Sequence, residues 1–285
     1  MPSSFQNTKD LQFVITLANG KVFQNGQNTV TLQGLRASVY IENAGGAMLG
    51  TMKAQIFGVS ESDMNTLTSL IWDNLIVTPS GSTFAFNSIQ VFALDGTQTT
   101  LVYQGDILNC WGVFMSMPEV YLYIEAQIGY LALVQPVPPL SISADTAIST
   151  VMGQLAQQMG YQFENNNVQG TVKKGTYLGS TLMEQARTLM QSFRFWMYLD
   201  GTNTLAIAPY GQARSTIAPL ISPQTGLIEY PAFNSTGVNF ATLYNRDLLL
   251  GGPVEIQSSI PKARGTWIVT SMSHQLTSQM PGGPW

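Results

Sequence analysis

The sequence has very few of the residues from which many proteins build covalent cross-links or metal sites. Only one cysteine, Cys110, and one histidine, His274, occur in 285 residues. A single cysteine cannot form an internal disulfide, and the pair falls short of the four ligands of a structural zinc site. The composition therefore excludes a disulfide scaffold and a zinc module, and we expect no metal and no cofactor.

Charged residues are also scarce. They make up 10% of the chain, with 12 basic and 16 acidic side chains and a formal net charge of -4, whereas an average soluble domain is about 25% charged. The sequence has no cluster of basic residues that could bind a phosphate backbone, so we expect no sequence-specific binding of nucleic acid. So little charge gives a monomer weak protection against association, which favours a subunit of a larger assembly.

Long apolar runs and a secretion signal are missing as well. No stretch reaches the 18 or more uncharged apolar residues of a membrane span, and the first ten residues lack a basic segment followed by an apolar one. We therefore expect a chain made in the cytoplasm that does not insert into membranes. Aromatic residues, at 10%, argue against intrinsic disorder.

The first half of the chain has the alternation of apolar and polar residues that is typical of strands, from Leu11 to about Val134. Asp95-Gly96 is its sharpest turn, since glycine accepts the positive φ of a tight hairpin, and it predicts arms over 89–94 and 100–104. Ser60 can cap one short helix over 61–71. This part reads as a β domain with a helix tucked between the strands of a barrel.

Prolines 136, 138 and 139 mark a boundary, after which the apolar period changes from about 2 to about 3.6. The pattern predicts a helix over 148–159, capped by Ser143 and ended by Gly160, and a second helix after a Thr181 cap. A hairpin is expected over 195–199 and 204–208. From Pro209 the chain returns to strands, expected at 226–229, 237–243, 254–258 and 267–271.

The predicted fold class is mainly β with an α+β insert. The domains are residues 1–135, 136–208 and 209–285, and the last is short for a full barrel, so strands from elsewhere in the chain could complete it. The order of elements is compatible with one β domain interrupted by the insert, and equally with two related β domains that flank it.

Candidate catalytic carboxylates do not form a convincing pair. Glu119 and Glu125, six residues apart on a predicted strand, would lie about 20 Å apart, beyond the roughly 10 Å that a glycosidase uses. Asp145 and Glu184 fall in predicted first helical turns, where a carboxylate complements the helix dipole. These residues argue against an enzyme that cleaves the cell wall.

His274 and Cys110, the candidate base and nucleophile, also lack the neighbouring sequence motifs that catalytic residues have. His274 has no serine elbow of the GxSxG type, and Cys110 lies beside Trp111 in an apolar strand. The phosphate-binding patterns GxxxxGK[ST] and GxGxxG are absent. We therefore expect no enzyme, and assign no catalytic, cofactor-binding or metal-binding residue.

Tryptophan offers one different hypothesis, that of a carbohydrate-binding or receptor-binding β module. Such a module would expose several rings together near polar side chains, so that they stack on sugars. The candidates are Trp72, Trp111, Trp267 and Trp285.

The order and spacing of motifs in the second half resemble the baseplate hub proteins of contractile-tailed bacteriophages, the late control D and T-even tail hub-like family. The insert from Gly175 to Pro209, with its helix and hairpin, looks like the insert of that family. The other segments that carry the resemblance are Thr225 to Pro231, Gly237 to Phe240, Leu243 to Asn245, Leu250 to Ile256, Gly265 to Val269 and Pro281 to Trp285.

The resemblance implies a structural protein of the virion tail, assembled in the host cytoplasm. It implies a homotrimer whose chains each hold two tube-like β-barrel domains around a small helix and hairpin domain, so that six barrels form a ring. That ring would be a symmetry adaptor between the sixfold tail tube and the threefold spike, and would line the conduit for DNA ejection. The implied partners are a tail tube or distal tail protein above, a central spike below, and tape-measure and wedge proteins. The hub of a related injection or secretion machine, or of a non-contractile tail, is the alternative.

Overall fold

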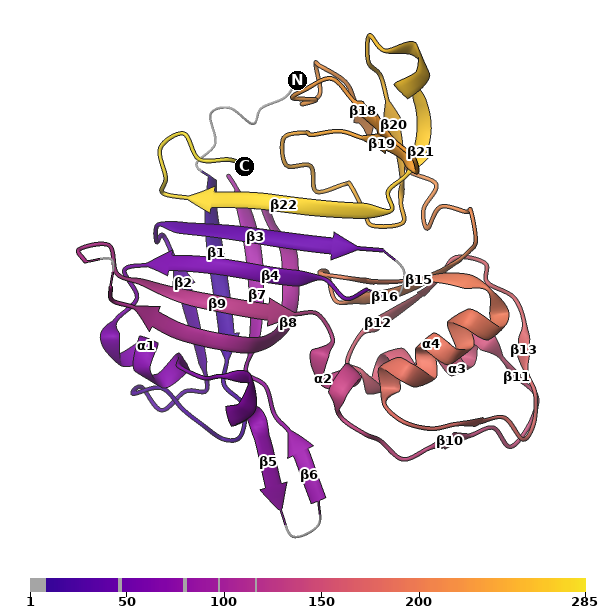
Figure 1. The fold of residues 1–285 in the computed structure, drawn as a ribbon, viewed down its shortest axis with the longest axis horizontal. Coiled ribbons are helices and arrows are strands. Elements are labelled where there is room, and N and C mark those ends of the chain that lie inside the picture. The colour runs from indigo at the N-terminus through magenta and orange to yellow at the C-terminus, as the bar shows by residue number, and fades with distance from the viewer. Residues whose placement is uncertain (1–8, 46–47, 79–80, 97, 116) are drawn as a thin grey trace.

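The largest unit is an antiparallel sheet of eight strands, in the order β2-β1-β7-β8-β9-β4-β3-β22 (Figure 1). It belongs to a computed structural model that describes residues 9–45, 48–78, 81–96, 98–115 and 117–285. The strands are β1 (Lys9–Thr16), β2 (Thr29–Gln33), β3 (Ala37–Ala44), β4 (Thr51–Phe57), β7 (Ser88–Asp95), β8 (Gln98–Val113), β9 (Tyr121–Gln127) and β22 (Ser271–Ser278).

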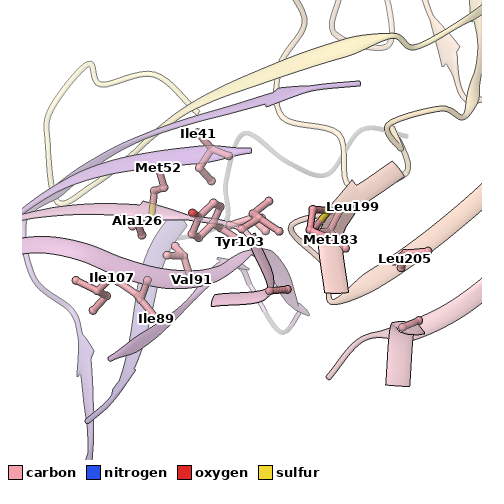
Figure 2. Packing of buried hydrophobic residues seen from close by; sticks show 14 of the residues in the cluster. Ile41, Met52, Ile89, Val91, Tyr103, Ile107, Ala126, Met183, Leu199 and Leu205 are labelled. Carbon is pink, nitrogen blue, oxygen red and sulfur yellow. The ribbon is translucent and has the colours of Figure 1, made fainter. Parts of the chain in front are cut away.

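Alternation along these strands builds the core. In β1 the side chains of Leu11, Phe13 and Ile15 are fully buried while their neighbours face outward, as expected where successive side chains point to opposite faces. Figure 2 shows that inward-facing side chains of β3, β4, β7, β8 and β9 likewise gather around Tyr103. The hairpin predicted at Asp95-Gly96 is confirmed: β7 pairs antiparallel with β8, and Gly96 has a φ of +63°.

The sheet is curled but open. Strands β1 and β22 come close together, yet in the described part of the chain no hydrogen-bonded ladder joins β2 to β22. The expected closed barrel is therefore not found.

Strand β22 places the end of the chain in the first sheet. It pairs antiparallel with β3 along its whole length, from Ser271 opposite Ala44 to Ser278 opposite Ala37. Leu276 of this strand is buried in the main core. Residues 271–278, which we expected within a C-terminal domain of residues 209–285, therefore form an edge strand of the eight-stranded sheet.

The first unit also carries a projecting ribbon. Helix α1 (Glu61–Leu67) begins as predicted, with Ser60 Oγ accepting a hydrogen bond from the Asp63 amide at 3.1 Å, but it ends four residues earlier than the predicted 61–71. A 3-10 turn, η1 (Ile71–Asn74), then leads into the antiparallel pair β5 (Leu75–Thr78) and β6 (Gly81–Phe84), which extends away from the sheet (Figure 1). Helix α2 (Tyr130–Val134) follows β9 and is the last element before the insert.

The insert packs two helices against a small sheet, as predicted. Thr181 caps the second helix, and Gly160, at φ +82°, follows the first. The Ser143 cap is wrong: the first helix begins after Ala147, because residues 146 and 147 are already paired in a strand. The elements are α3 (Ile148–Gln158), α4 (Leu182–Phe193), the sheet strands β12 (Gln162–Asn165), β15 (Phe195–Asp200) and β16 (Thr204–Pro209), and the short pairs β10 (Leu140–Ser141) with β14 (Tyr177–Leu178) and β11 (Thr146–Ala147) with β13 (Thr171–Val172).

Residues 209–270, which we call the C-terminal module, have a core of their own formed by Ile221, Val254 and Ile256. The expected strand at 226–229 contributes only an isolated bridge between Leu227 and Thr242. The module's elements are β17 (Leu220–Ile221), β18 (Ala232–Asn234), β19 (Gly237–Asn239), β20 (Pro253–Ile256), β21 (Gly265–Ile268) and the 3-10 turn η2 (Pro261–Ala263).

Candidate assembly surfaces and a buried junction

Glu119 and Glu125, which we expected on one strand, are held by separate partners. Glu125 lies on β9, whereas Glu119 precedes that strand, so its predicted strand position is wrong. Glu119 forms an ion pair with Arg36. Glu125 accepts hydrogen bonds from Asn109 Nδ2 at 3.0 Å and from the Tyr123 hydroxyl at 2.8 Å. Each carboxylate therefore has its own local partners, and the two do not share a hydrogen bond or a common partner among the contacts described here.

The two helix carboxylates differ from each other. Glu184 lies in the first turn of α4, as predicted, and bonds Arg187 at 2.9 Å. Asp145 does not lie in a helix; it precedes β11 and accepts hydrogen bonds from Lys173 Nζ at 2.8 Å and the Lys174 amide at 2.9 Å. The hydrogen bond from Lys173 lowers the pKa of Asp145. Both carboxylates are exposed, and each forms an ion pair with a neighbouring basic side chain.

Burial keeps Cys110 and His274 uncharged at neutral pH. Desolvation raises the pKa of the Cys110 thiol to about 12, so the reactive thiolate does not form. Desolvation also lowers the pKa of His274 to about 4, and its ring meets the Tyr244 ring at an angle, 5.8 Å between centroids. Both residues therefore act as packing residues.

The partly buried His274 predicts a loss of stability in mild acid. Its pKa in the folded protein, about 4, lies below the value of about 6.5 expected when unfolded. The unfolded chain therefore binds the proton first, and stability falls as the pH drops from about 6.5 to about 4. We expect His274→Gln to remove about 1–3 kcal/mol of this pH dependence.

Urea unfolding at pH 7, pH 5.5 and pH 4.5 measures this effect. The quantity compared is the difference in unfolding free energy between the wild type and His274→Gln at each pH. A difference that stays constant across the three pH values would contradict a desolvated imidazole that stays neutral in the folded protein.

The four tryptophans are not exposed together. Trp72 is exposed, but Trp111 packs on Tyr123 with 4.9 Å between ring centroids. Trp267 donates its indole N–H to the Ala263 carbonyl at 3.0 Å, and Trp285 packs against the main core. This arrangement gives no stacking platform for a sugar.

A buried ionic junction connects the insert to the C-terminal module. Arg214, whose side chain is only 3% exposed, pairs with the buried carboxylate of Asp200 and, at 2.9 Å, with Glu164. Its guanidinium also reaches the Leu250 carbonyl at 3.4 Å. Arginine suits this position because its planar fork can serve several acceptors at once. No local sequence pattern indicates this cluster, because Asp200, Leu250 and Glu164 lie 14, 36 and 50 residues from Arg214 along the chain.

Exposed apolar side chains occur in two groups, one beside the first sheet and one in the C-terminal module. The arm patch comprises Leu70, Trp72, Leu75 and Val77 at η1 and β5, and the module patch comprises Ile228, Tyr230 and Phe233. Trp72 is 82% and Tyr230 77% exposed. Single exposed apolar residues are ordinary, whereas several together mark interaction surfaces. In the sequence, these patches correspond to large apolar residues in turn-rich segments.

An open cleft of about 480 Å³ separates the β7–β8 hairpin from the module. Its polar lining includes Asp95, Arg246 and Asp247, and Arg246 bonds Gln98 across it. This hydrogen bond connects the hairpin to the module. Within the described ranges, no three His, Cys, Asp or Glu side chains gather as a metal site would need. None of the helices in those ranges combines the length and apolar character needed to cross a membrane.

Solved structures share this fold at low sequence identity. A tail protein from Neisseria meningitidis MC58 has a TM-score of 0.58 at 11% identity, covering 96% of this chain and 94% of that one. The 43 kDa tail protein of prophage MuSo2 from Shewanella oneidensis has 0.53 at 9%, covering 93% of both. A type VI secretion component of E. coli, described as similar to phage T4 tail proteins, has 0.54 at 9%, covering 86% and 71%.

Comparison with curated proteins finds no match. A family model described as baseplate hub gp41, however, matches residues 11–281, and therefore spans the curled sheet, the insert, the module and the returning strand β22. That coverage includes every unit of the fold described above. The chain is a member of the baseplate hub gp41 family, a family of structural phage tail proteins.

Proposed function

We propose that this chain is the homotrimeric hub at the centre of a phage baseplate. Three copies would form a ring, and each copy would contribute two wall segments: the curled eight-stranded sheet and the C-terminal module. The six segments would then face the sixfold tail tube, while the threefold axis holds a central spike. The observation that carries the proposal is the family match over residues 11–281.

The distribution of charge supports a role as conduit wall. Residues 54–172 contain nine acidic residues and no lysine or arginine. A wall that repels phosphate keeps DNA from adhering as it passes. We infer that the sheet side of each copy, where most of these residues lie, contributes to the lining of the conduit.

The proposed neighbours follow from this position. A tail tube or distal tail protein would sit above the ring and a spike protein below it, with tape-measure and wedge proteins at its inner and outer surfaces. The proposed site of action is the virion tail, after assembly in the host cytoplasm. The fold is shared with a type VI secretion component, so the hub of an injection machine is the alternative, which neighbouring genes would distinguish.

The stoichiometry tests the proposal directly. Light scattering of the concentrated chain is expected to give three times 31.0 kDa, and imaging of intact tails should place three copies around the central axis. One copy, six copies, or density away from the axis would contradict the hub.

A further inference from the structure

The loop between β1 and β2 holds both Asn-Gly pairs of the sequence, Asn19-Gly20 and Asn25-Gly26. All four residues are exposed. A glycine that follows an asparagine has no side chain to shield its backbone nitrogen, so that nitrogen can reach the carbon of the neighbouring side-chain amide. The two pairs therefore offer the same chemistry within one loop, and the fold around each pair decides which of them reacts.

The Asn19-Gly20 pair lies at the centre of a tight turn that has a single restraint. Asn19 has a φ of +58° and Gly20 a φ of +68°, as the central residues of a type I′ turn do. The Lys21 amide closes the turn by donating to the Ala18 carbonyl at 3.2 Å. Among the described residues, neither the Asn19 side chain nor the Gly20 amide has a hydrogen-bond partner. Both reacting groups of this pair are therefore free.

The Asn25-Gly26 pair is held by three hydrogen bonds. The Asn25 Oδ1 accepts from the Gln27 amide at 2.9 Å. The Gly26 amide donates to the Phe23 carbonyl at 2.9 Å, and the Phe23 amide donates to the Gln27 carbonyl at 2.8 Å. Phe23 is itself buried in the main core. The side-chain amide and the glycine nitrogen of this pair are thus both engaged, and their bonds must break before the two groups can meet.

We propose that Asn19 is a deamidation site and that the fold protects Asn25 from the same reaction. The backbone nitrogen of Gly20 attacks the Cγ of Asn19 and closes a succinimide ring. The side-chain nitrogen leaves as ammonia and takes the proton of the Gly20 amide with it. Water then opens the ring at either carbonyl, which leaves aspartate or isoaspartate. The product carries a new negative charge, and isoaspartate also lengthens the backbone of the turn.

The difference between the two sites lies in how easily each turn opens. The attack requires the asparagine to leave its turn conformation. At Asn19 one long hydrogen bond opposes this movement, whereas at Asn25 three shorter bonds and a buried anchor oppose it. A segment with fewer hydrogen bonds and fewer buried contacts opens more often. We therefore expect deamidation in the folded chain to be at least tenfold faster at Asn19 than at Asn25.

Trypsin separates the two sites into different peptides. Lys9, Lys21 and Arg36 are the basic residues of this segment, so Asn19 falls in the peptide 10–21 and Asn25 in the peptide 22–36. The folded chain is incubated in dilute, mildly alkaline buffer made with heavy-oxygen water, and is then digested in ordinary water. Mass spectrometry measures the labelled aspartate and isoaspartate in each peptide, because only conversion during the incubation introduces the heavy oxygen.

The same incubation in denaturing urea keeps the sequence and removes the hydrogen bonds of both turns. We expect the two rates to become similar there, since both sites are then the same dipeptide in an open chain. Equal rates in the folded chain, faster conversion of Asn25, or a ratio of rates that urea leaves unchanged would each overturn the proposal. So would a folded chain in which Asn19 stays intact over a time that converts it in urea.

A matched pair of variants assigns the label to its residue. Asn19→Gln should remove the label from the peptide 10–21, because glutamine would have to close a larger and less favourable ring. Asn25→Gln should leave the label of that peptide unchanged. The other side-chain amide of this peptide is Gln12, so a label that persists in Asn19→Gln would show that Asn19 is not the reacting residue.

Discussion

Removal of residues 271–285 is expected to abolish cooperative unfolding of the eight-stranded sheet. The deletion takes away β22, which pairs with all of β3, and leaves the backbone edge of β3 without its partner strand. Leu276, buried in the main core, would be lost with it. A chain with separate N- and C-terminal domains would instead keep its first domain folded, so a thermal melt of residues 1–270 distinguishes the two.

Two controls keep this prediction specific. A peptide of residues 271–285 added to the truncated chain should restore part of the transition, because the strand acts by pairing. In the full chain, Leu276→Ala is expected to lower the unfolding free energy by about 2–5 kcal/mol, whereas Leu220→Ala, at a partly exposed site, should cost much less. Equal melting of the truncated and full chains would refute the role of β22.

Replacement of Arg214 by methionine is expected to cost about 3–5 kcal/mol of unfolding free energy. The change leaves the Asp200 carboxylate, 7% exposed, buried without its cation. Urea denaturation at pH 7 measures the loss, and protease sensitivity of the module should rise with it, because Arg214 connects the module to the insert.

A surface pair and a double variant serve as controls. Lys173 and Asp145 form an ion pair with side chains 75% and 51% exposed, so Lys173→Met should change stability by less than about 1 kcal/mol. Combining Arg214→Met with Asp200→Asn should recover much of the loss, because no charge then stays buried alone. A double variant as unstable as the single one would show that the arginine acts through packing alone.

The local elements could be predicted from sequence because their causes are local. Ser60 and Thr181 cap helices by bonding amides three residues ahead, and Gly160 takes the left-handed turn that ends α3. Alternation marked the strands of the first domain. Ser143 failed as a cap because β11 pairs with a distant strand just before the helix, a contact that local sequence does not encode.

The sequence by itself determined the class of the molecule: a β-rich chain with an α+β insert, poor in charge and without a metal or catalytic cluster to expect. Only the tertiary structure decided that β22 returns to β3 across more than 200 residues and that Arg214 meets Asp200 and Glu164. Capping and alternation act within a few residues, so a sequence displays them. Strand partners and buried ion pairs depend on which distant surfaces the core brings together, and that is settled only when the whole chain packs.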